Sequence, residues 1–201
     1  MTVAAGDVKA LRDRTGAGMM ECKRALEEAN GDSDQAVEIL RVKGQAKAAK
    51  RGEREAAEGA VSSYVHSNNR IGVIVEVNCE TDFVARNDEF LQFARDIALH
   101  IAGAPAPPRW VSEEDVPPEE LEEERRVLAQ QADSSKPPEV QEKMTEGRLR
   151  KWLEEVVLLK QQHVNADRYE GRTIEQLRTD ISAKTGENVV IRRFARFQVG
   201  G

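Results

Sequence analysis

The chain has 201 residues, of which 33% are charged and 4% aromatic, and its formal net charge is −6. This negative charge argues against a protein that acts mainly on nucleic-acid backbones, because such affinity comes from Lys and Arg side chains that neutralise phosphates. No apolar run approaches the ~20 residues that cross a bilayer, and the N-terminal stretch carries no secretory pattern, so we expect a soluble cytoplasmic protein that binds no membrane.

The first part of the chain predicts a bundle of three short helices. An apolar face with Val8 and Leu11 ends at Gly16, and glycine permits the left-handed turn that closes a helix. The second helix has one apolar stripe, formed by Met19, Cys22, Leu26 and Ala29. Asp32, with a glutamine three residues later, is typical of the cap that starts a third helix. We assign this bundle to residues 1–43.

A basic segment follows the bundle. Between Arg41 and Arg54, six Lys and Arg side chains accompany a single acid, Glu53. A run of this kind is usually a solvated helix, and a surface that faces a protein partner or RNA is the alternative. We expect residues 44–58 to form a helical linker.

The next part predicts a small antiparallel sheet. Over residues 71–79 apolar side chains alternate with others, which is the period of a half-buried strand. Residues 67–69 fit the turn of a hairpin that pairs this strand with residues 61–66. Asn87 can then cap a helix whose apolar face ends at Gly103.

Two long charged helices are predicted beyond a Pro-rich stretch. They cover about Pro118–Gln131 and Pro138–Val157, and Ser134–Pro137 separates them. Proline suits the first position of a helix, where its missing N–H would have no partner. We expect these helices to form a protruding hairpin at about residues 112–157.

The C-terminal part predicts a last helix and a last strand. Thr173 and Gln176 have the spacing of a capping pair, and Gly186 marks the end of the helix. Residues 189–197 are β-branched and aromatic with interleaved arginines, as in a strand at a sheet edge. The expected fold class is therefore α+β, in which residues 59–201 form a core of helices packed on a small antiparallel sheet.

Two places depart from the amphipathic pattern. Met20 shares its helix face with charged side chains such as Lys23, which suggests a docking patch, although single exposed apolar residues are common. The other place is the turn Thr81–Val84 between the strand and the helix. There Phe83 either drops into the core while Asp82 caps a helical turn, or projects as a probe for a partner's apolar pocket.

Catalytic and metal sites are not predicted. The sequence has no motif for a phosphate-binding loop or a helical zinc site. Cys22 and Cys79 are too few for a disulfide scaffold or a zinc site, so we expect both in the core. Cys79 and His66 could be neighbours across the hairpin, but no orienting group accompanies them. We therefore expect a protein that acts by binding, without covalent chemistry, cofactor or bound metal.

The chain resembles the bacterial elongation factor Ts family, the nucleotide exchange factors of the translational GTPase elongation factor Tu. Two long stretches carry the resemblance, Leu11–Lys23 and Glu76–Arg86. Shorter stretches at Glu146–Leu149 and Glu187–Phe194 extend it toward the C-terminus. The resemblance implies a guanine-nucleotide exchange factor whose N-terminal bundle is ubiquitin-associated-like.

The same resemblance implies roles for particular residues. Arg12, Met19 and Met20 would dock on the GTPase domain of elongation factor Tu. The exchange turn would consist of Thr81, Asp82, Phe83 and Val84. Asp82 and Phe83 would intrude between helices of the GTPase and displace magnesium, which neutralises phosphate charge, so that GDP leaves and GTP can bind.

The short, single-core form of the family implies a homodimer. Tyr64, His66 and Arg70 would be second-subunit contacts, and residues 59–201 would serve as the dimerisation domain. No direct nucleic-acid contact is expected in this interpretation. Two alternatives stay open: an RNA- or ribosome-associated protein that uses the basic segment and the terminal arginines, and a ubiquitin-like adaptor, which leaves the turn at Thr81 unexplained.

Overall fold

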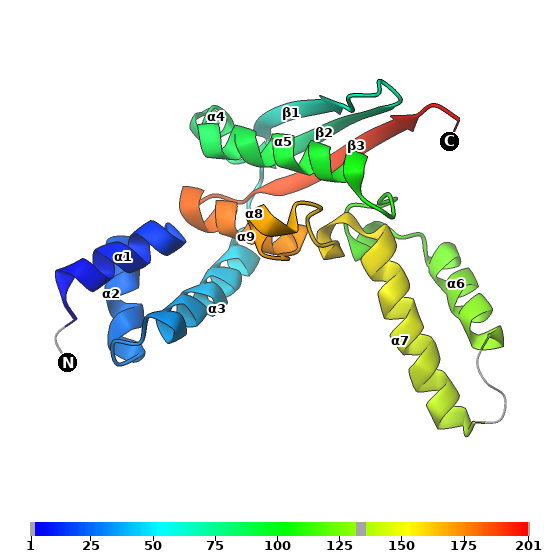
Figure 1. Cartoon of the computed structure of the whole chain (residues 1–201), viewed down its shortest axis with the longest axis horizontal. Coiled ribbons are helices and arrows are strands. Elements are labelled where there is room, and N and C mark those ends of the chain that lie inside the picture. The colour runs from blue at the N-terminus through cyan, green and yellow to red at the C-terminus, as the bar shows by residue number, and fades with distance from the viewer. Residues whose placement is uncertain (1–2, 132–135, 201) are drawn as a thin grey trace. The chain divides into compact units, whose positions relative to one another are not determined.

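The computed structural model describes residues 3–131 and 136–200, and Figure 1 shows the order of their elements. The helices are α1 (Ala5–Thr15), α2 (Met19–Glu28), α3 (Ser33–Arg51), α4 (Asp82–Ala85), α5 (Asp88–Gly103), α6 (Pro118–Gln130), α7 (Pro138–Val156), α8 (Ala166–Tyr169) and α9 (Ile174–Thr185), with 3-10 turns η1 (Glu113–Asp115) and η2 (Leu158–Lys160). The strands are β1 (Glu58–Val65), β2 (Ile71–Cys79) and β3 (Val190–Gln198). The predicted α+β class is confirmed.

The chain divides into two compact units. The first contains the chain up to Gly59 together with Asn78–Phe90 and Arg178–Val190. The second contains Ala60–Val77, Leu91–Leu177 and the chain from Ile191 onward. The predicted turn at Thr81–Val84 therefore belongs to the same unit as the N-terminal helices.

Helices α1, α2 and α3 form the predicted bundle. Its buried core is made of small and medium apolar side chains: Val8, Leu11, Cys22, Ala25, Leu26, Ala29 and Ala36. Gly16 ends α1 with a φ of +69°. Asp32 starts α3, because its Oδ1 accepts hydrogen bonds from the amides of Asp34 and Gln35, both at 2.9 Å. Both predicted helix boundaries are thus confirmed.

The two methionines of α2 differ from the predicted pattern in one respect. Met19 does not lie in the buried stripe, since it is 47% exposed. It is the first residue of α2, before the turns that pack in the bundle, and Ala25 takes the inward position instead. The buried part of the predicted stripe therefore begins at Cys22. Met20 is 57% exposed, as predicted.

Helix α3 is longer than the third helix of a minimal bundle. Its 19 residues continue to Arg51, so the bundle and the first part of the expected linker share one helix. Residues 52–57 are not helical and lead into β1 at Glu58. The helix stops at Gly52, which is a poor helix former because its backbone is the most flexible.

The three strands form one sheet in the order β1-β2-β3. In the β1–β2 hairpin the amide of His66 donates to the carbonyl of Ile71 at 2.9 Å, and Asn69 in the predicted turn has a φ of +55°. Between β2 and β3 the amide of Val199 donates to the carbonyl of Arg70 at 2.9 Å. Both registers are those of antiparallel pairs.

The two faces of the sheet have different environments. On β2, Val73, Val75 and Val77 are buried, and α5 lies along this face (Figure 1). Ile74 lies between them on β2 and is exposed, so it points to the opposite face. The antiparallel registers place exposed apolar side chains of β1 and β3 on that outer face too: Val61, Val65 and Phe197.

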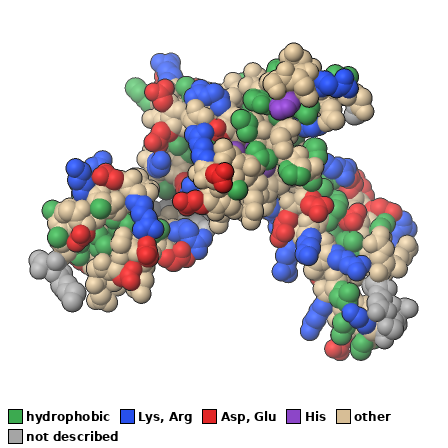
Figure 2. Space-filling model, viewed as in Figure 1, with side chains coloured by type: hydrophobic (Ala, Val, Ile, Leu, Met, Phe, Trp, Pro, Cys, Tyr) green, Lys and Arg blue, Asp and Glu red, His purple; other side chains and the backbone are tan. Residues whose placement is uncertain are grey.

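Helices α6 and α7 form the predicted hairpin, and their ends lie within one residue of the predicted ones. At its base is a small core of buried and half-buried side chains: Val116, Leu153, Val157, Trp110, Leu121, Trp152 and Val156. Acidic and basic side chains are interspersed over its surface (Figure 2). Of the predicted loop, Ser134 and Ser135 lie outside the described residues. Among the residues described, no helix is long and apolar enough to span a membrane.

A buried polar network ties α5 to the segment after η2. The side-chain Nε2 of Gln161 donates to the carbonyls of Ala106 (2.9 Å) and Glu155 (2.6 Å), which leaves its Oε1 to accept from His100 Nε2 at 2.8 Å. His100 Nδ1 then accepts from the amide of Val164 at 3.2 Å. Every polar atom of this neutral imidazole is satisfied.

Helix α9 begins and ends where the sequence predicts. The amide of Thr173 donates to the Gln176 side chain at 3.0 Å, and the amide of Gln176 donates back to the Thr173 hydroxyl at 3.3 Å. Gly186 follows the helix with a φ of +78°. The capping pair and the stop signal are both confirmed, and they place the residues after Gly186 beside the end of β2.

Candidate functional site

The turn after β2 carries the most exposed large apolar side chain in the described parts of the chain. Phe83 is 85% exposed on the four-residue helix α4. Of the two alternatives left by the sequence, burial of Phe83 in the core is therefore excluded. An exposed aromatic ring is costly in water and is typical of a residue that binds another molecule.

The helical turn is capped by Thr81 and not by Asp82. The Thr81 hydroxyl accepts a hydrogen bond from the amide of Val84 at 3.5 Å, and Thr81 has the extended backbone of an N-cap residue. Asp82 is half-buried and pairs with Arg86 at 3.1 Å. Its carboxylate thus lies in the first turn of α4, next in sequence to the exposed ring of Phe83.

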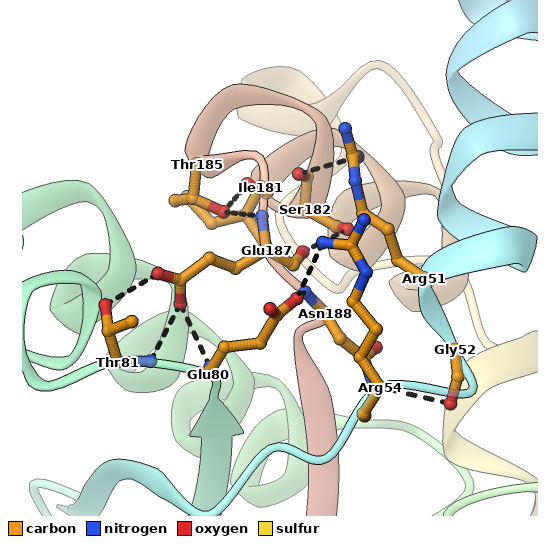
Figure 3. A network of polar contacts seen from close by, with 10 residues as sticks. All are labelled: Arg51, Gly52, Arg54, Glu80, Thr81, Ile181, Ser182, Thr185, Glu187 and Asn188. Atoms are coloured by element: carbon orange, nitrogen blue, oxygen red, sulfur yellow. Dashed lines mark hydrogen bonds and ion pairs between the residues drawn. The ribbon is translucent and has the colours of Figure 1, made fainter.

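Glu187 holds the turn from the side (Figure 3). Its Oε2 accepts hydrogen bonds from the amides of Glu80 at 2.9 Å and Thr81 at 3.1 Å, and its Oε1 accepts one from the Thr81 hydroxyl at 2.6 Å. Hydrogen bonds to an ionised carboxylate are roughly twice as strong as neutral ones. The start of the turn is therefore fixed by a single side chain.

A second carboxylate, that of Glu80, accepts a hydrogen bond from the segment that carries Glu187. Glu80 Oε1 accepts from the amide of Asn188 at 2.6 Å and pairs with Arg54 at 3.4 Å. The Asn188 side chain donates to the carbonyls of Arg54 at 2.8 Å and Gly52 at 3.4 Å (Figure 3). The end of β2, the start of β3 and the chain after α3 are thereby joined in one polar network.

Sequence reasoning did not assign a role to Glu187. The residue is separated from Thr81 by 106 positions, and no local periodicity connects the two. The only local signal is an acidic residue directly after the helix stop at Gly186, which is compatible with any surface loop. Only the antiparallel pairing of β2 with β3 brings this carboxylate to the turn.

The residues expected to dock on a partner are exposed in the bundle. Arg12 lies near the end of α1, while Met19 and Met20 form the start of α2. Gly18 precedes α2 in an extended conformation. All three side chains are therefore accessible to a partner.

The expected second-subunit contacts lie around the β1–β2 hairpin, in the second compact unit. Tyr64 and His66 are half-buried, and the Tyr64 hydroxyl lies 3.3 Å from His66 Nδ1. Arg70 is exposed and donates to the carbonyl of Val199 at 3.3 Å. These residues form a group separate from the turn at Thr81.

The cysteine considered as a nucleophile is unsuited to that role. Burial, and next the charge of Glu187, raise the pKa of Cys79 to about 11, so the thiol stays protonated at neutral pH. The hairpin register places His66 opposite Ile71, at the other end of β2 from Cys79. The idea that Cys79 and His66 are neighbours is therefore wrong. Within the described ranges, no group of His, Cys, Asp and Glu side chains could hold a metal ion.

Fold and site together define an α+β protein that carries one exposed aromatic residue on a fixed turn, an arrangement typical of protein-binding factors. A sequence model of the family described as elongation factor Ts matches residues 19–170. The protein named elongation factor Ts of Carboxydothermus hydrogenoformans is 57% identical over 96% of this chain and 87% of its own length. Its namesake from Thermosipho melanesiensis is 51% identical over 98% of this chain and 99% of its own length.

A third relative, elongation factor Ts of Thermodesulfovibrio yellowstonii, is 50% identical over 100% of this chain and 98% of its own length. The chain belongs to the elongation factor Ts family. It is accordingly a guanine-nucleotide exchange factor of translation elongation. The comparisons give no support to the RNA-binding alternative.

Proposed function

We propose that the protein binds elongation factor Tu in its GDP form and releases the nucleotide by inserting the turn Thr81–Val84 into the GTPase. The observation that carries this proposal is Phe83, which is 85% exposed on a turn held by three hydrogen bonds. A rigid aromatic side chain loses little entropy when it enters an apolar pocket, so most of its contact energy is available for binding.

The Asp82 carboxylate enters the site together with the ring. A carboxylate near the nucleotide competes electrostatically with the phosphates and disturbs the magnesium that bridges them. Loss of magnesium removes much of the affinity for GDP, and GTP can then bind. No covalent bond is made or broken. Because the coupling between two ligands of one protein is reciprocal, GDP weakens binding of the exchange factor by the same factor.

Residues 1–43 act as the docking domain and contact the GTPase domain through Arg12, Met19 and Met20. The exposure of these side chains supports the assignment, because a flexible, polarisable methionine adapts to a partner surface. Residues 44–58 link the bundle to the core, residues 59–201. The protein works in the cytoplasm and makes no direct contact with nucleic acid.

The decisive measurement is the release of fluorescent GDP from elongation factor Tu, recorded without factor, with the wild-type protein, and with Asp82→Ala and Phe83→Ala. Wild-type protein accelerates release, and both variants lose most of the acceleration while they keep their fold, which circular dichroism monitors. Release that is unchanged by the wild-type protein would refute the proposed function. Full activity of Phe83→Ala would refute the proposed site.

The core, including the hairpin at residues 112–157, serves as the dimerisation domain of a homodimer, with Tyr64, His66 and Arg70 at the second-subunit contacts. Support comes from the outer face of the sheet, on which four large apolar side chains are exposed: Val61, Val65, Ile74 and Phe197. Several exposed apolar side chains on one face of a sheet are typical of a surface that binds another protein chain.

Sedimentation velocity at micromolar concentration tests the dimer. Ile74→Glu places a charge on the outer face of the sheet and converts the dimer to a monomer. Val42→Glu is the matched control, because Val42 is equally exposed (53% against 51%) but lies on α3. A wild-type protein that sediments only as a monomer, or a control that dissociates equally, contradicts the proposal.

A further inference from the structure

The exchange turn is too short to fix its own direction. Helix α4 has four residues, which is about one turn, and so short a helix is not stable by its own hydrogen bonds. Neither Asp82 nor Phe83 is among the buried residues, so burial does not anchor them. Their direction must come from groups at the start of the turn.

Thr81 is the link between the turn and the rest of the unit. Its hydroxyl donates to Glu187 Oε1 at 2.6 Å and accepts from the amide of Val84 at 3.5 Å. The bond to Glu187 therefore fixes the hydroxyl oxygen that caps α4. Its amide donates to the other oxygen of the same carboxylate at 3.1 Å. Thr81 is thus held by Glu187 through both its backbone and its side chain.

Glu187 is itself firmly held at the end of α9. Its amide donates to the Thr185 hydroxyl at 3.4 Å, and its carbonyl accepts from the Ser182 hydroxyl at 2.6 Å. Gly186 adopts a positive φ of +78°, which sets the direction in which the chain leaves the helix. The carboxylate accordingly extends from a rigid base, the C-terminal turn of α9, to a turn that has no rigid base of its own (Figure 3).

Glu80 and Glu187 form a reciprocal pair. Each carboxylate accepts a backbone amide from the other segment: Glu187 from Glu80 at 2.9 Å, and Glu80 from Asn188 at 2.6 Å. Such a pair resembles a capping box, but it joins the end of β2 to the start of β3. It fixes the distance between the two segments, while the additional bonds from Glu187 to Thr81 are directed at the turn alone.

We infer that Glu187 is a positioning residue of nucleotide exchange: through Thr81 it sets the direction in which Asp82 and Phe83 project before a partner binds. This inference rests on the proposed function. Glu187 does not touch the partner. It raises the rate of GDP release because the turn needs no ordering when it enters the GTPase, and an entropy cost that is paid on folding is not paid again on binding.

The test measures GDP release from elongation factor Tu as a function of factor concentration, for full-length wild type, Glu187→Ala and Glu187→Gln. Loss of hydrogen bonds to a charged group lowers the maximal release rate of Glu187→Ala by about 10- to 100-fold. The half-saturating concentration changes by less than about threefold, because most of the docking surface is intact. Glu187→Gln recovers most of the rate, since its amide oxygen can accept both backbone amides.

Controls separate positioning from general folding. Glu53→Ala removes an exposed acid from the same unit and leaves the release rate unchanged. Thr81→Val tests the same link without touching Glu187, and it lowers the maximal rate. In a background that carries both Asp82→Ala and Phe83→Ala, Glu187→Ala has no further effect, because the side chains that it positions are already missing.

The outcomes distinguish the inference from the proposed function. If Phe83→Ala lowers the rate but Glu187→Ala does not, the proposed function stands and the inference is overturned. If Glu187→Ala slows release equally in the background that lacks both the Asp82 and the Phe83 side chain, Glu187 acts on the whole fold and the inference is also overturned. If Phe83→Ala has the wild-type rate, the proposed function itself fails.

Discussion

Lowering the pH from 7 to 5 is expected to destabilise the protein through one buried histidine. Burial lowers the pKa of His100 from its usual 6.5 to about 4, against the smaller opposing effect of its hydrogen bond to Gln161. The geometry gives the reason, because a second proton on His100 would face the amide of Val164, which already donates to Nδ1. The folded state therefore resists protonation where the unfolded state accepts it.

The direction and the size of the change in folding stability follow from this shift in the pKa of His100. A group whose folded pKa is lowered contributes stability that is fully present above the unfolded pKa and is lost as the pH falls toward the folded value. The window for His100 is therefore between pH 6.5 and about 4. At pH 5 the unfolded histidine is almost fully protonated and the folded one is not, which corresponds to about 2 kcal/mol. Burial also lowers the pKa of His163, so its contribution has the same sign.

Urea unfolding followed by circular dichroism at pH 7 and pH 5 measures this difference. The variant His100→Asn keeps an oxygen acceptor for Val164 but cannot take up a proton in this range. It is less stable than wild type at both pH values, and its loss between pH 7 and pH 5 is smaller by about 2 kcal/mol. A loss equal to that of wild type would show that the buried imidazole is not the group that titrates, and the reasoning would be wrong.

Four further substitutions test helix propensity, packing and a surface ion pair. Gly147→Ala raises the free energy of unfolding, measured in thermal melts, by about 0.5–1 kcal/mol. A Cβ at this position of α7 meets no atom within 4 Å, and alanine favours the helical conformation more than glycine does. A lower free energy of unfolding in the variant would contradict this expectation. Phe90→Ala costs about 3–5 kcal/mol in urea unfolding because the ring is fully buried, while Phe83→Ala stays within about 0.5 kcal/mol of wild type. Arg193→Ala costs less than about 1 kcal/mol, since the Arg193 side chain of the ion pair with Glu76 is 81% exposed. Equal stability losses at low and high salt would argue against an electrostatic origin.

Local signals in the sequence predicted most of the elements. The helix after Thr173 was recognisable because a capping pair and a helix-ending glycine act within a few residues, and the structure has both. The same holds for β2, whose alternation of apolar residues reports burial of one face directly. The exposure of Met19 could not be predicted from the apolar stripe, because helical periodicity does not tell how much of the first turn is covered by the bundle.

The candidate site was only partly predictable. Asp82 and Phe83 could be singled out because Phe83 fits neither the strand nor the helix period, but the choice between core and surface needed the fold. Their support by Glu187 depends on a pairing between strands that are far apart in sequence. Side chains brought together by tertiary pairing leave no periodic pattern that a single sequence could reveal.

The separation between the turn and its carboxylate also has a consequence for synthesis on the ribosome. The amide of Glu80 is made 107 residues before the side chain of Glu187 that accepts its hydrogen bond. The N-terminal bundle, with contacts between neighbouring helices, can fold as soon as it emerges. A nascent chain can therefore contain a folded N-terminal bundle while the turn at Thr81 still lacks the carboxylate that holds it, until β3 has joined the sheet.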